Sequence, residues 1–355
     1  MASAQMAAPP QPAAPSWRLE PLAGWHLPLL HDPAFLPLQP VLQRAVWLGV
    51  PERLLHALTA RQPLAPRVLV AFQGTTPEGL IVTRRVNRSG SCWQVQHLRL
   101  ASSSHRRQLA SCLLRAAIRE TRGASSWIAN AASLDSDRLA VLREQGFQPL
   151  RTDQLWRWNA MVHAAPAADP AACPADLQLQ PLSRRHALPL WQLEQAACPA
   201  QLRQLLDRRV EDLLDQSQTR GWLLVEPGRD QAVAAIRWLG EHPGGGHDVE
   251  LTVHPGWQQL LGAPTELLLR RLQQQLGGGT AVDLWLRCDV QDQGRRSWLQ
   301  RLGAEPRGER VLMARSVWRR QEHPATAALA ARQLEAVLGQ LQPRRQPLPT
   351  PLTPR

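Results

Sequence analysis

The chain has 355 residues, of which 44% are hydrophobic, and a net charge of +12; this length predicts about two domains. The composition, with 14 tryptophans, excludes a largely disordered chain, and no apolar run reaches the length of a membrane span. The five scattered cysteines form no CxxC pair, so neither a disulfide framework nor a zinc site is indicated, and a cytoplasmic location is expected.

The positive charge is concentrated in the first half of the chain. All 41 basic residues are arginine, and 18 of them lie between Trp17 and Asn159, against 9 acidic residues. Residues 160–318 are nearly neutral, with 17 arginines against 18 acidic residues. A basic first half favours an anionic partner, either a phosphate-bearing cofactor or nucleic acid, although net charge alone does not separate these from compositional drift.

Residues 1–15 are rich in alanine and proline and predict a disordered tail. After them, apolar or alternating runs bounded by turn residues predict strands, and apolar residues at helical spacing predict helices. The first half is expected to contain a strand (17–22), a helical stretch (41–58), three strands (68–72, 80–86, 93–100), a helix (106–121), a strand (126–129), a helix (135–145) and a strand (150–158). Turns are expected at 74–79 and 87–91.

An Ala/Pro linker over 161–175 leads into a second half with the same order of elements. The repetition is visible in Leu19–Leu22 and Leu179–Leu182, and in Val141–Phe147 and Trp298–Ala304. The expected elements are strands over 177–182, 222–225, 232–239, 249–253, 282–288 and 310–318, and helices over 184–196, 200–216, 264–276 and 292–302. Two domains, 16–160 and 176–320, are predicted, followed by a helix (324–342) and a disordered proline-rich tail.

This order of elements resembles the GNAT-type N-acetyltransferase fold, present twice in tandem. The resemblance covers nearly all of residues 16–319. It implies an α/β (α+β) fold in which each unit is a mixed, mostly antiparallel sheet flanked by helices. It also implies an N-acyltransferase that moves an acyl group from acetyl-CoA, or a similar thioester, to an amine of a small molecule or a protein.

The cofactor motif of this family, Gln/Arg-x-x-Gly-x-Gly/Ala, follows the fourth strand, where small residues let backbone N–H groups approach the pyrophosphate. The second half matches it from Gln258 or from Gln259, each with one departure, and the first half matches it from Arg106 without the central glycine. The cofactor-binding residues implied are Leu251, Val253, Gln258, Gln259, Leu260, Leu261, Gly262 and Ala263, and in the first half Leu98, Leu100, Arg106, Arg107, Gln108, Leu109, Ala110 and Ser111. The alternative is that each loop is an ordinary strand-to-helix connection.

The general base of this family often lies on the fourth strand, at Glu250 in the second half and His97 in the first. The alternatives are a solvated strand carboxylate for Glu250 and a sheet-face histidine for His97. The tyrosine that protonates the leaving thiolate in many relatives is replaced by Leu142 and Leu299, and the chain contains no tyrosine. The second half, with the closer motif and the carboxylate, is favoured for catalysis.

Two other functions stay open on the sequence alone. One is a catalytically degenerate tandem pair that acts as a scaffold or as an acyl-CoA-binding protein. The other is an arginine-rich, nucleic-acid-associated protein that uses residues such as Arg84, Arg85 and Arg88. A V-shaped opening between the fourth and fifth strands, lined by backbone donors, would favour the enzyme. No metal and no membrane partner are expected, and the oligomeric state is left open.

Overall fold

The computed structural model describes residues 16–59, 65–101, 105–121, 123–159, 174–216, 220–278, 280 and 282–316. The predicted N-terminal tail, nearly all of the linker and the predicted C-terminal helix and tail lie outside these residues. Within the part that is described, no helix is long and apolar enough to span a membrane.

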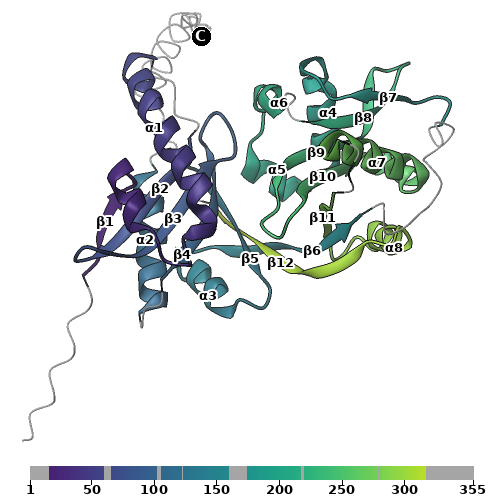
Figure 1. Ribbon diagram of the computed structural model, residues 1–355. Helices are drawn as coiled ribbons and strands as arrows, with labels where there is room; N and C mark the ends of the chain where they lie inside the picture. Colours follow the sequence, from purple (N-terminus) through teal and green to yellow (C-terminus); the bar gives the residue numbers. More distant parts are fainter. Residues whose placement is uncertain are drawn as a thin grey trace, which may run out of the picture. The chain divides into compact units, whose positions relative to one another are not determined.

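The first half follows the predicted order of elements (Figure 1). They are β1 (Arg18–Pro21), α1 (Gln39–Thr59), β2 (Arg67–Gln73), β3 (Thr76–Arg85), β4 (Cys92–Leu100), α2 (Arg106–Glu120), β5 (Ser126–Ala132), α3 (Ser136–Glu144) and β6 (Gln148–Trp158), with short 3-10 helices over Gly24–Leu29 and Leu36–Leu38. The prediction of a turn over 74–79 is wrong in length, since β3 already begins at Thr76. Gly74 has a positive φ of 62°, which lets the chain reverse within two residues.

The strands of the second half repeat this order, and one of the predicted helices is divided. Its elements are β7 (Gln178–Pro181), α4 (Ala187–Ala197), α5 (Ala200–Leu206), α6 (Val210–Gln216), β8 (Gly221–Glu226), β9 (Gln231–Glu241), β10 (His247–Val253), α7 (Ala263–Gly277), β11 (Leu284–Asp289), α8 (Gln293–Arg301) and β12 (Glu305–Ser316). The single helix predicted over 200–216 is wrong. Asp207 adopts the left-handed conformation (φ 43°) and ends α5, because a residue with positive φ does not continue a right-handed helix.

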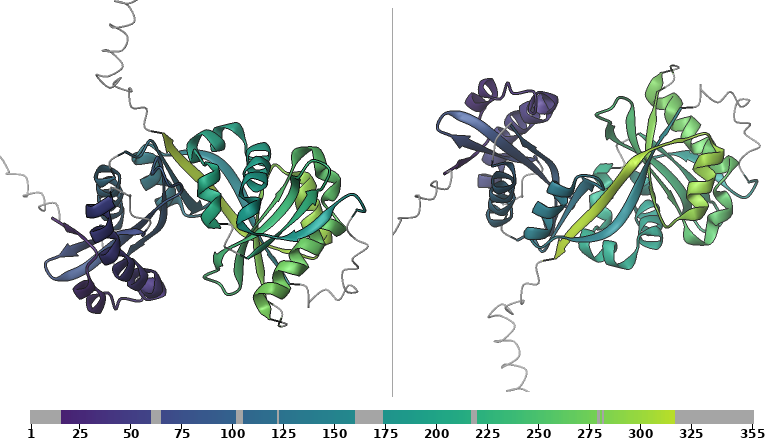
Figure 2. Two further views of the ribbon diagram at one scale, coloured as in Figure 1. Left: turned by 90° about the horizontal axis from the view of Figure 1, so that it is seen from above. Right: turned by 90° about the horizontal axis from the view of Figure 1, so that it is seen from below.

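All twelve strands form one sheet in the order β1-β2-β3-β4-β5-β12-β6-β11-β10-β9-β8-β7. The last strand of each half therefore pairs with the other half: β12 lies beside β5, and β6 lies beside β11. The two exchanged strands are also antiparallel neighbours of each other. In Figure 2 the long yellow-green strand β12 can be followed from the second half into the first.

The cores confirm this exchange of strands. Met313, on β12, is 0% exposed and belongs to the core cluster built from β2–β5, α2 and α3. Trp156 and Trp158, on β6, are each 1% exposed and belong to the core cluster under α7 and α8. The predicted fold class is confirmed, since each half is a mixed, mostly antiparallel sheet with helices on both faces. The boundaries 16–160 and 176–320 stay a prediction, and the exchanged strands cross them in space.

Candidate functional site

The fourth and fifth strands of the second half separate after a short parallel contact. β10 pairs with β11 only at His247↔Leu284 and Asp248↔Trp285, although β10 continues to Val253 and β11 to Asp289. The Leu251 carbonyl accepts a hydrogen bond of 3.2 Å from Arg295 of α8, on the side of this gap. Since the N–H and C=O of a strand residue point to the same side, the N–H groups of Leu251 and, two residues on, Val253 face the opening.

The first half contains the same opening. β4 pairs with β5 from Cys92↔Ser126 to Val95↔Ala129 and then leaves it, at an extra residue, Gln96, that has no partner on β3. The Ala101 N–H donates to the Glu78 carbonyl of β3 at 2.8 Å. By alternation, the backbone groups of Leu98 and Leu100 point away from β3 and into the opening. The opening between the fourth and fifth strands, which the resemblance to GNAT-type enzymes implies, is therefore present in both halves.

The cofactor motif of the second half lines a cavity of about 340 Å³ at the start of α7. Its walls include Gly262 and Ala263 from the motif, Trp298 from α8 and Trp158 from β6. The loop before α7 is fixed by the fully buried Thr265 hydroxyl, which accepts from the Gly262 N–H at 3.1 Å and donates to the Leu260 carbonyl at 3.0 Å. The start of α7 therefore borders a hollow of defined shape. Pro264 has no N–H and the Gly262 N–H is taken by Thr265, so Ala263 is the residue of this turn whose backbone N–H is best placed for a ligand.

The remaining cofactor-binding residues implied by the sequence divide into two groups. Some have side chains buried in the hydrophobic cores, so that only their backbone can meet a ligand: Leu251, Val253, Leu260, Leu109 and Ala110. Others are partly buried or exposed at the surface: Gln258, Gln259, Leu261, Leu98, Leu100, Arg106, Arg107, Gln108 and Ser111.

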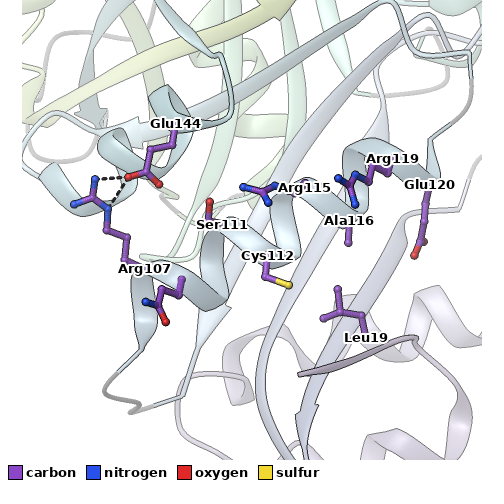
Figure 3. Close-up of a pocket in the computed structure, with 10 residues that line it drawn as sticks. Leu19, Arg107, Ser111, Cys112, Arg115, Ala116, Arg119, Glu120 and Glu144 are labelled. Carbon is purple, nitrogen blue, oxygen red and sulfur yellow. Dashed lines mark hydrogen bonds and ion pairs between the residues drawn. The ribbon is translucent and has the colours of Figure 1, made fainter. Parts of the chain in front are cut away.

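A larger groove of about 690 Å³ follows the outer face of α2 in the first half (Figure 3). It includes the predicted residues Arg107, Gln108 and Ser111, and three arginines line it, Arg107, Arg115 and Arg119. Arg107 is held by Glu144 of α3, with 2.8 Å between Nε and Oε1. This groove begins at the first turn of α2 and extends along the helix to Glu120.

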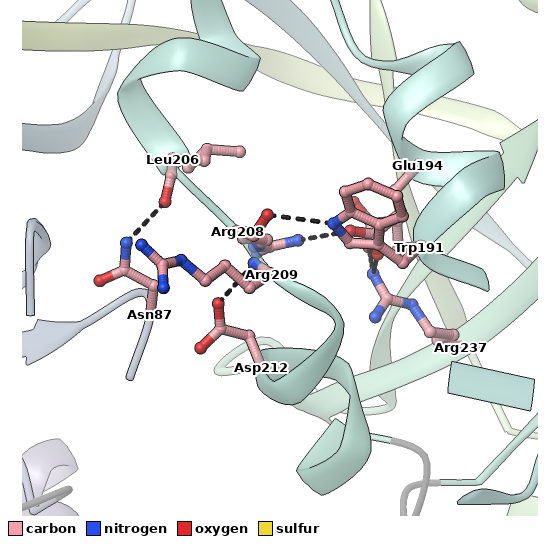
Figure 4. A network of polar contacts seen from close by, with 9 residues as sticks. Asn87, Trp191, Glu194, Leu206, Arg208, Arg209, Asp212 and Arg237 are labelled. Atoms are coloured by element: carbon pink, nitrogen blue, oxygen red, sulfur yellow. Dashed lines mark hydrogen bonds and ion pairs between the residues drawn. The ribbon is translucent and has the colours of Figure 1, made fainter. Parts of the chain in front are cut away.

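The predicted base Glu250 contacts a network of charges in the second half. Figure 4 shows Glu194, Arg208 and Arg237 of this network, together with Asn87 of the first half. Its carboxylate contacts Arg237, which lies directly opposite on β9 and also binds Glu194 of α4. Arg208 binds Glu194 at 3.2 Å. The neighbouring Asp207 is fixed from the first half, because Asn87 donates to its carbonyl at 3.1 Å.

These contacts decide the protonation of Glu250. Burial alone would raise the pKa of its carboxyl, but Arg237 and Arg208 outweigh this effect and lower the pKa to about 2. A carboxylate with so low a pKa is a weak proton acceptor and a good binder of ammonium or N–H groups. The Glu250 side chain is 43% exposed, so part of it is accessible to a ligand.

His97 stands just after the extra residue of β4. Burial, together with the charges of Arg99 and Arg138, lowers the pKa of its imidazole to about 4. Because the unfolded chain takes up this proton more readily than the folded protein, acid favours unfolding. The stability that this shift contributes is therefore complete above the unfolded pKa of about 6.5 and is lost as the pH falls from there to about 4. We expect wild-type protein to lose more stability than His97→Gln between pH 7 and pH 4.5 in urea unfolding. An imidazole that titrates near 6.5 by NMR would contradict this.

Three residues of the site were not identified from the sequence. Arg237 and Trp158 fall within predicted strands and Arg295 within a predicted helix, and no motif in the sequence marks any of them as functional. Each lies far along the chain from the group it meets, so no local spacing marks it. A partial signal exists for Arg295, because Asp292 caps the first turn of α8 and so fixes where the third residue after it stands.

Comparison with solved structures gives the fold class. The structure is similar to a tandem GNAT protein from the clavulanic acid biosynthesis pathway, with TM-score 0.52 and 15% identity over 86% of this chain and 99% of that one. It is also similar to a GCN5-related glucosamine N-acetyltransferase region of a fungal multi-domain β-N-acetylglucosaminidase, with TM-score 0.55 and 12% identity over 85% of this chain and 38% of that one. A Drosophila protein gives TM-score 0.52 and 13% identity over 84% and 98%.

The chain therefore has the GNAT superfamily fold, built from two tandem units. At these identities the likeness defines the fold and leaves the activity open. No protein-family profile and no curated protein sequence matches the chain.

Proposed function

We propose that the protein transfers an acyl group from acetyl-CoA, or a similar thioester, to an amine, and that the second half is the working unit. The observation that supports this most directly is the opening between β10 and β11, which the N–H groups of Leu251 and Val253 face. A separate cavity lies at the start of α7, the helix that follows β10 in the chain. An extended thioester arm can pair with the free edge of β10 as an added strand would. The phosphates would meet the N-terminus of α7, where Gly262 and Ala263 leave room.

The chemistry needs little beyond this arrangement. The amine nitrogen attacks the thioester carbonyl, a C–N bond forms, and the C–S bond breaks as the thiolate leaves. Backbone N–H groups of β10 stabilise the negative charge that develops on the oxygen. Glu250 stays ionised and orients the amine, whose proton passes to water. With no tyrosine in the chain, the thiolate takes its proton from water, which its moderate pKa allows.

A cytoplasmic location belongs to the same proposal. Among the described residues Cys92, Cys112, Cys198 and Cys288 are free thiols, as a reducing compartment keeps them. The acceptor, a small-molecule or a protein amine, is addressed below.

Isothermal titration with acetyl-CoA tests where the thioester binds. We expect wild-type protein to bind it and Ala263→Trp to bind at least about tenfold more weakly, a loss of about 1.4 kcal/mol, because an indole fills the cavity at α7. The double variant Arg106→Ala, Arg107→Ala removes charge from the first half and should bind nearly as wild type. The reverse pattern would place the thioester in the first half, and no binding by the wild type would refute the proposal.

One observation favours a second candidate. Arg295 donates to the Leu251 carbonyl and so occupies part of the opening between β10 and β11. A protein that binds acyl-CoA there without transferring the acyl group would fit this contact. Release of free thiol from acetyl-CoA in the presence of an amine distinguishes the two, since only the enzyme releases it faster than buffer.

A further inference from the structure

One face of the sheet in the second half gathers charged side chains from neighbouring strands. Directly paired residues on adjacent strands point to the same face, and so do residues two apart along a strand. Asp248 of β10 pairs with Trp285 of β11. Two residues on from each, Glu250 and Arg287 therefore share this face, on either side of the opening.

The same argument extends across the exchanged strands. Arg287 pairs with Leu155 of β6. Asp153 lies two residues before Leu155 on the same strand, and it pairs with Arg310 of β12. Arg310 therefore lies on the same face as Arg287, with one strand between them. We refer to Arg287 and Arg310 as the arginine pair. Its two members belong to the second half, and the strand between them comes from the first.

Nearby carboxylates are already engaged. Glu250 contacts Arg237, and Asp153 is held by Arg151 at 2.9 Å and 3.2 Å, one contact to each oxygen. Two further carboxylates have other partners, since Asp248 contacts His242 and Asp289 accepts from the Gln291 N–H. Within the described residues, the side chains of Arg287 and Arg310 form no ion pair or hydrogen bond.

The two members of the arginine pair repel each other. Burial and the neighbouring charge of Arg287 lower the pKa of the Arg310 guanidinium, and Asp248 offsets part of this effect. Arg287 itself is exposed and close enough to Glu250 to contribute to the lowered pKa of that carboxyl. An oxyanion placed between the two guanidiniums would relieve their repulsion and accept hydrogen bonds from their N–H groups.

The arrangement of Glu250 and the arginine pair fits a ligand that has a positive group at one end and a negative group at the other. Glu250 offers an ionised, partly exposed carboxylate at the edge of the opening, and the arginine pair offers two positive charges on the same face. We propose that the acyl acceptor is an amine that also bears an oxyanion, a carboxylate or a phosphate, which the arginine pair binds while Glu250 holds the amine. This rests on the proposed acyl transfer.

Matched amines provide the test. The pairs are alanine and alaninamide, phenylalanine and phenylalaninamide, and phosphoethanolamine and ethanolamine, each titrated into the protein and assayed for acetyl-CoA-dependent thiol release. We expect the anionic member of at least one pair to bind about tenfold more tightly than its neutral partner. A preference for the amino acids identifies a carboxylate site, and one for phosphoethanolamine identifies a phosphate site.

Substitution then assigns the preference to residues. Arg287→Gln and Arg310→Gln should each remove most of the roughly tenfold preference, mainly through KM for the anionic amine. The neutral amine should change much less, and in Arg287→Gln only through the lost charge near Glu250. Arg229→Gln is the matched control, because Arg229 lies in the β8–β9 turn and its side chain is 73% exposed. Equal binding of both members of every pair, no binding of any anionic member, or a preference that survives both substitutions overturns the inference.

The titrations separate this inference from the proposed function. Acetyl-CoA binding and thiol release by the wild type test acyl transfer, and neither needs the arginine pair for the thioester itself. Direct binding of the anionic amines tests the arginine pair without turnover. Anionic-amine binding that depends on Arg287 and Arg310, in a protein that releases no thiol, would refute the enzyme and leave the anion site standing.

Discussion

Replacing Trp158 by alanine is expected to destabilise the second half of the molecule, although Trp158 belongs to the first half of the chain. Its indole is 1% exposed and packs in the core under α7 and α8. Removing a buried indole of this kind lowers the free energy of unfolding by about 3–5 kcal/mol. Urea unfolding followed by tryptophan fluorescence measures the loss, and hydrogen exchange locates it.

Hydrogen exchange makes this prediction specific to the exchanged strands. In Trp158→Ala, amides of β10 and β11 should lose protection, because their core has lost its contribution from β6. Trp25→Ala is the control, since the Trp25 side chain is 76% exposed, and its stability should stay within about 0.5 kcal/mol of wild type. Loss of protection confined to β1–β5 would contradict the strand order described above.

Replacing Arg237 by methionine is the second substitution with a large expected effect. The Arg237 side chain is 3% exposed and contacts both Glu194, at 11% exposure, and Glu250. Methionine leaves these carboxylates near each other without the charge between them, and breaking such a buried pair costs about 3–5 kcal/mol. We expect a loss of stability near the lower end of this range, about 3 kcal/mol, because Arg208 still binds Glu194. Urea unfolding at pH 7 measures this loss.

The same variant should change the response to acid. In the wild type the pKa of Glu250 is about 2, below its unfolded value of about 4.3. The stability from this shift is present above the unfolded value and is lost as the pH falls through about 4 toward 2. Arg237→Met should show less loss in this range, because the pKa of Glu250 rises. Arg229→Gln is the control, and a variant as stable and as acid-sensitive as wild type would contradict the ion-pair network.

The elements could be predicted because their patterns are local. Val68–Phe72 is an unbroken apolar run, and Leu109, Leu113 and Ala117 fall on one side of α2, where all three are buried. The exchange of β6 and β12 could not be predicted in this way. The two halves are duplicates, so each last strand has a pattern that fits either sheet, and only the tertiary structure chooses between them.

The partner of Glu250 depends on the register between β9 and β10, which the sequence does not show. Asp248 pairs with Gly240, and an uninterrupted ladder would place Trp238 opposite Glu250. The extra residue Leu239 shifts the ladder, so that Arg237 lies there instead. One β-bulge thus turns a possible base into a partner of an ion pair. The opening between the fourth and fifth strands was anticipated from the resemblance, whereas the contact that Arg295 makes inside it was not.

The exchanged strands also bear on how such a chain can evolve. A gene that lost either half would leave the other without the strand that completes its sheet, with Met313 missing from one core and Trp156 and Trp158 from the other. Selection on one working half therefore preserves the second half even after its own binding residues have changed. A copy that no longer binds or catalyses is retained because it completes the fold of its neighbour. Substitutions in one copy are therefore constrained by the core of the other.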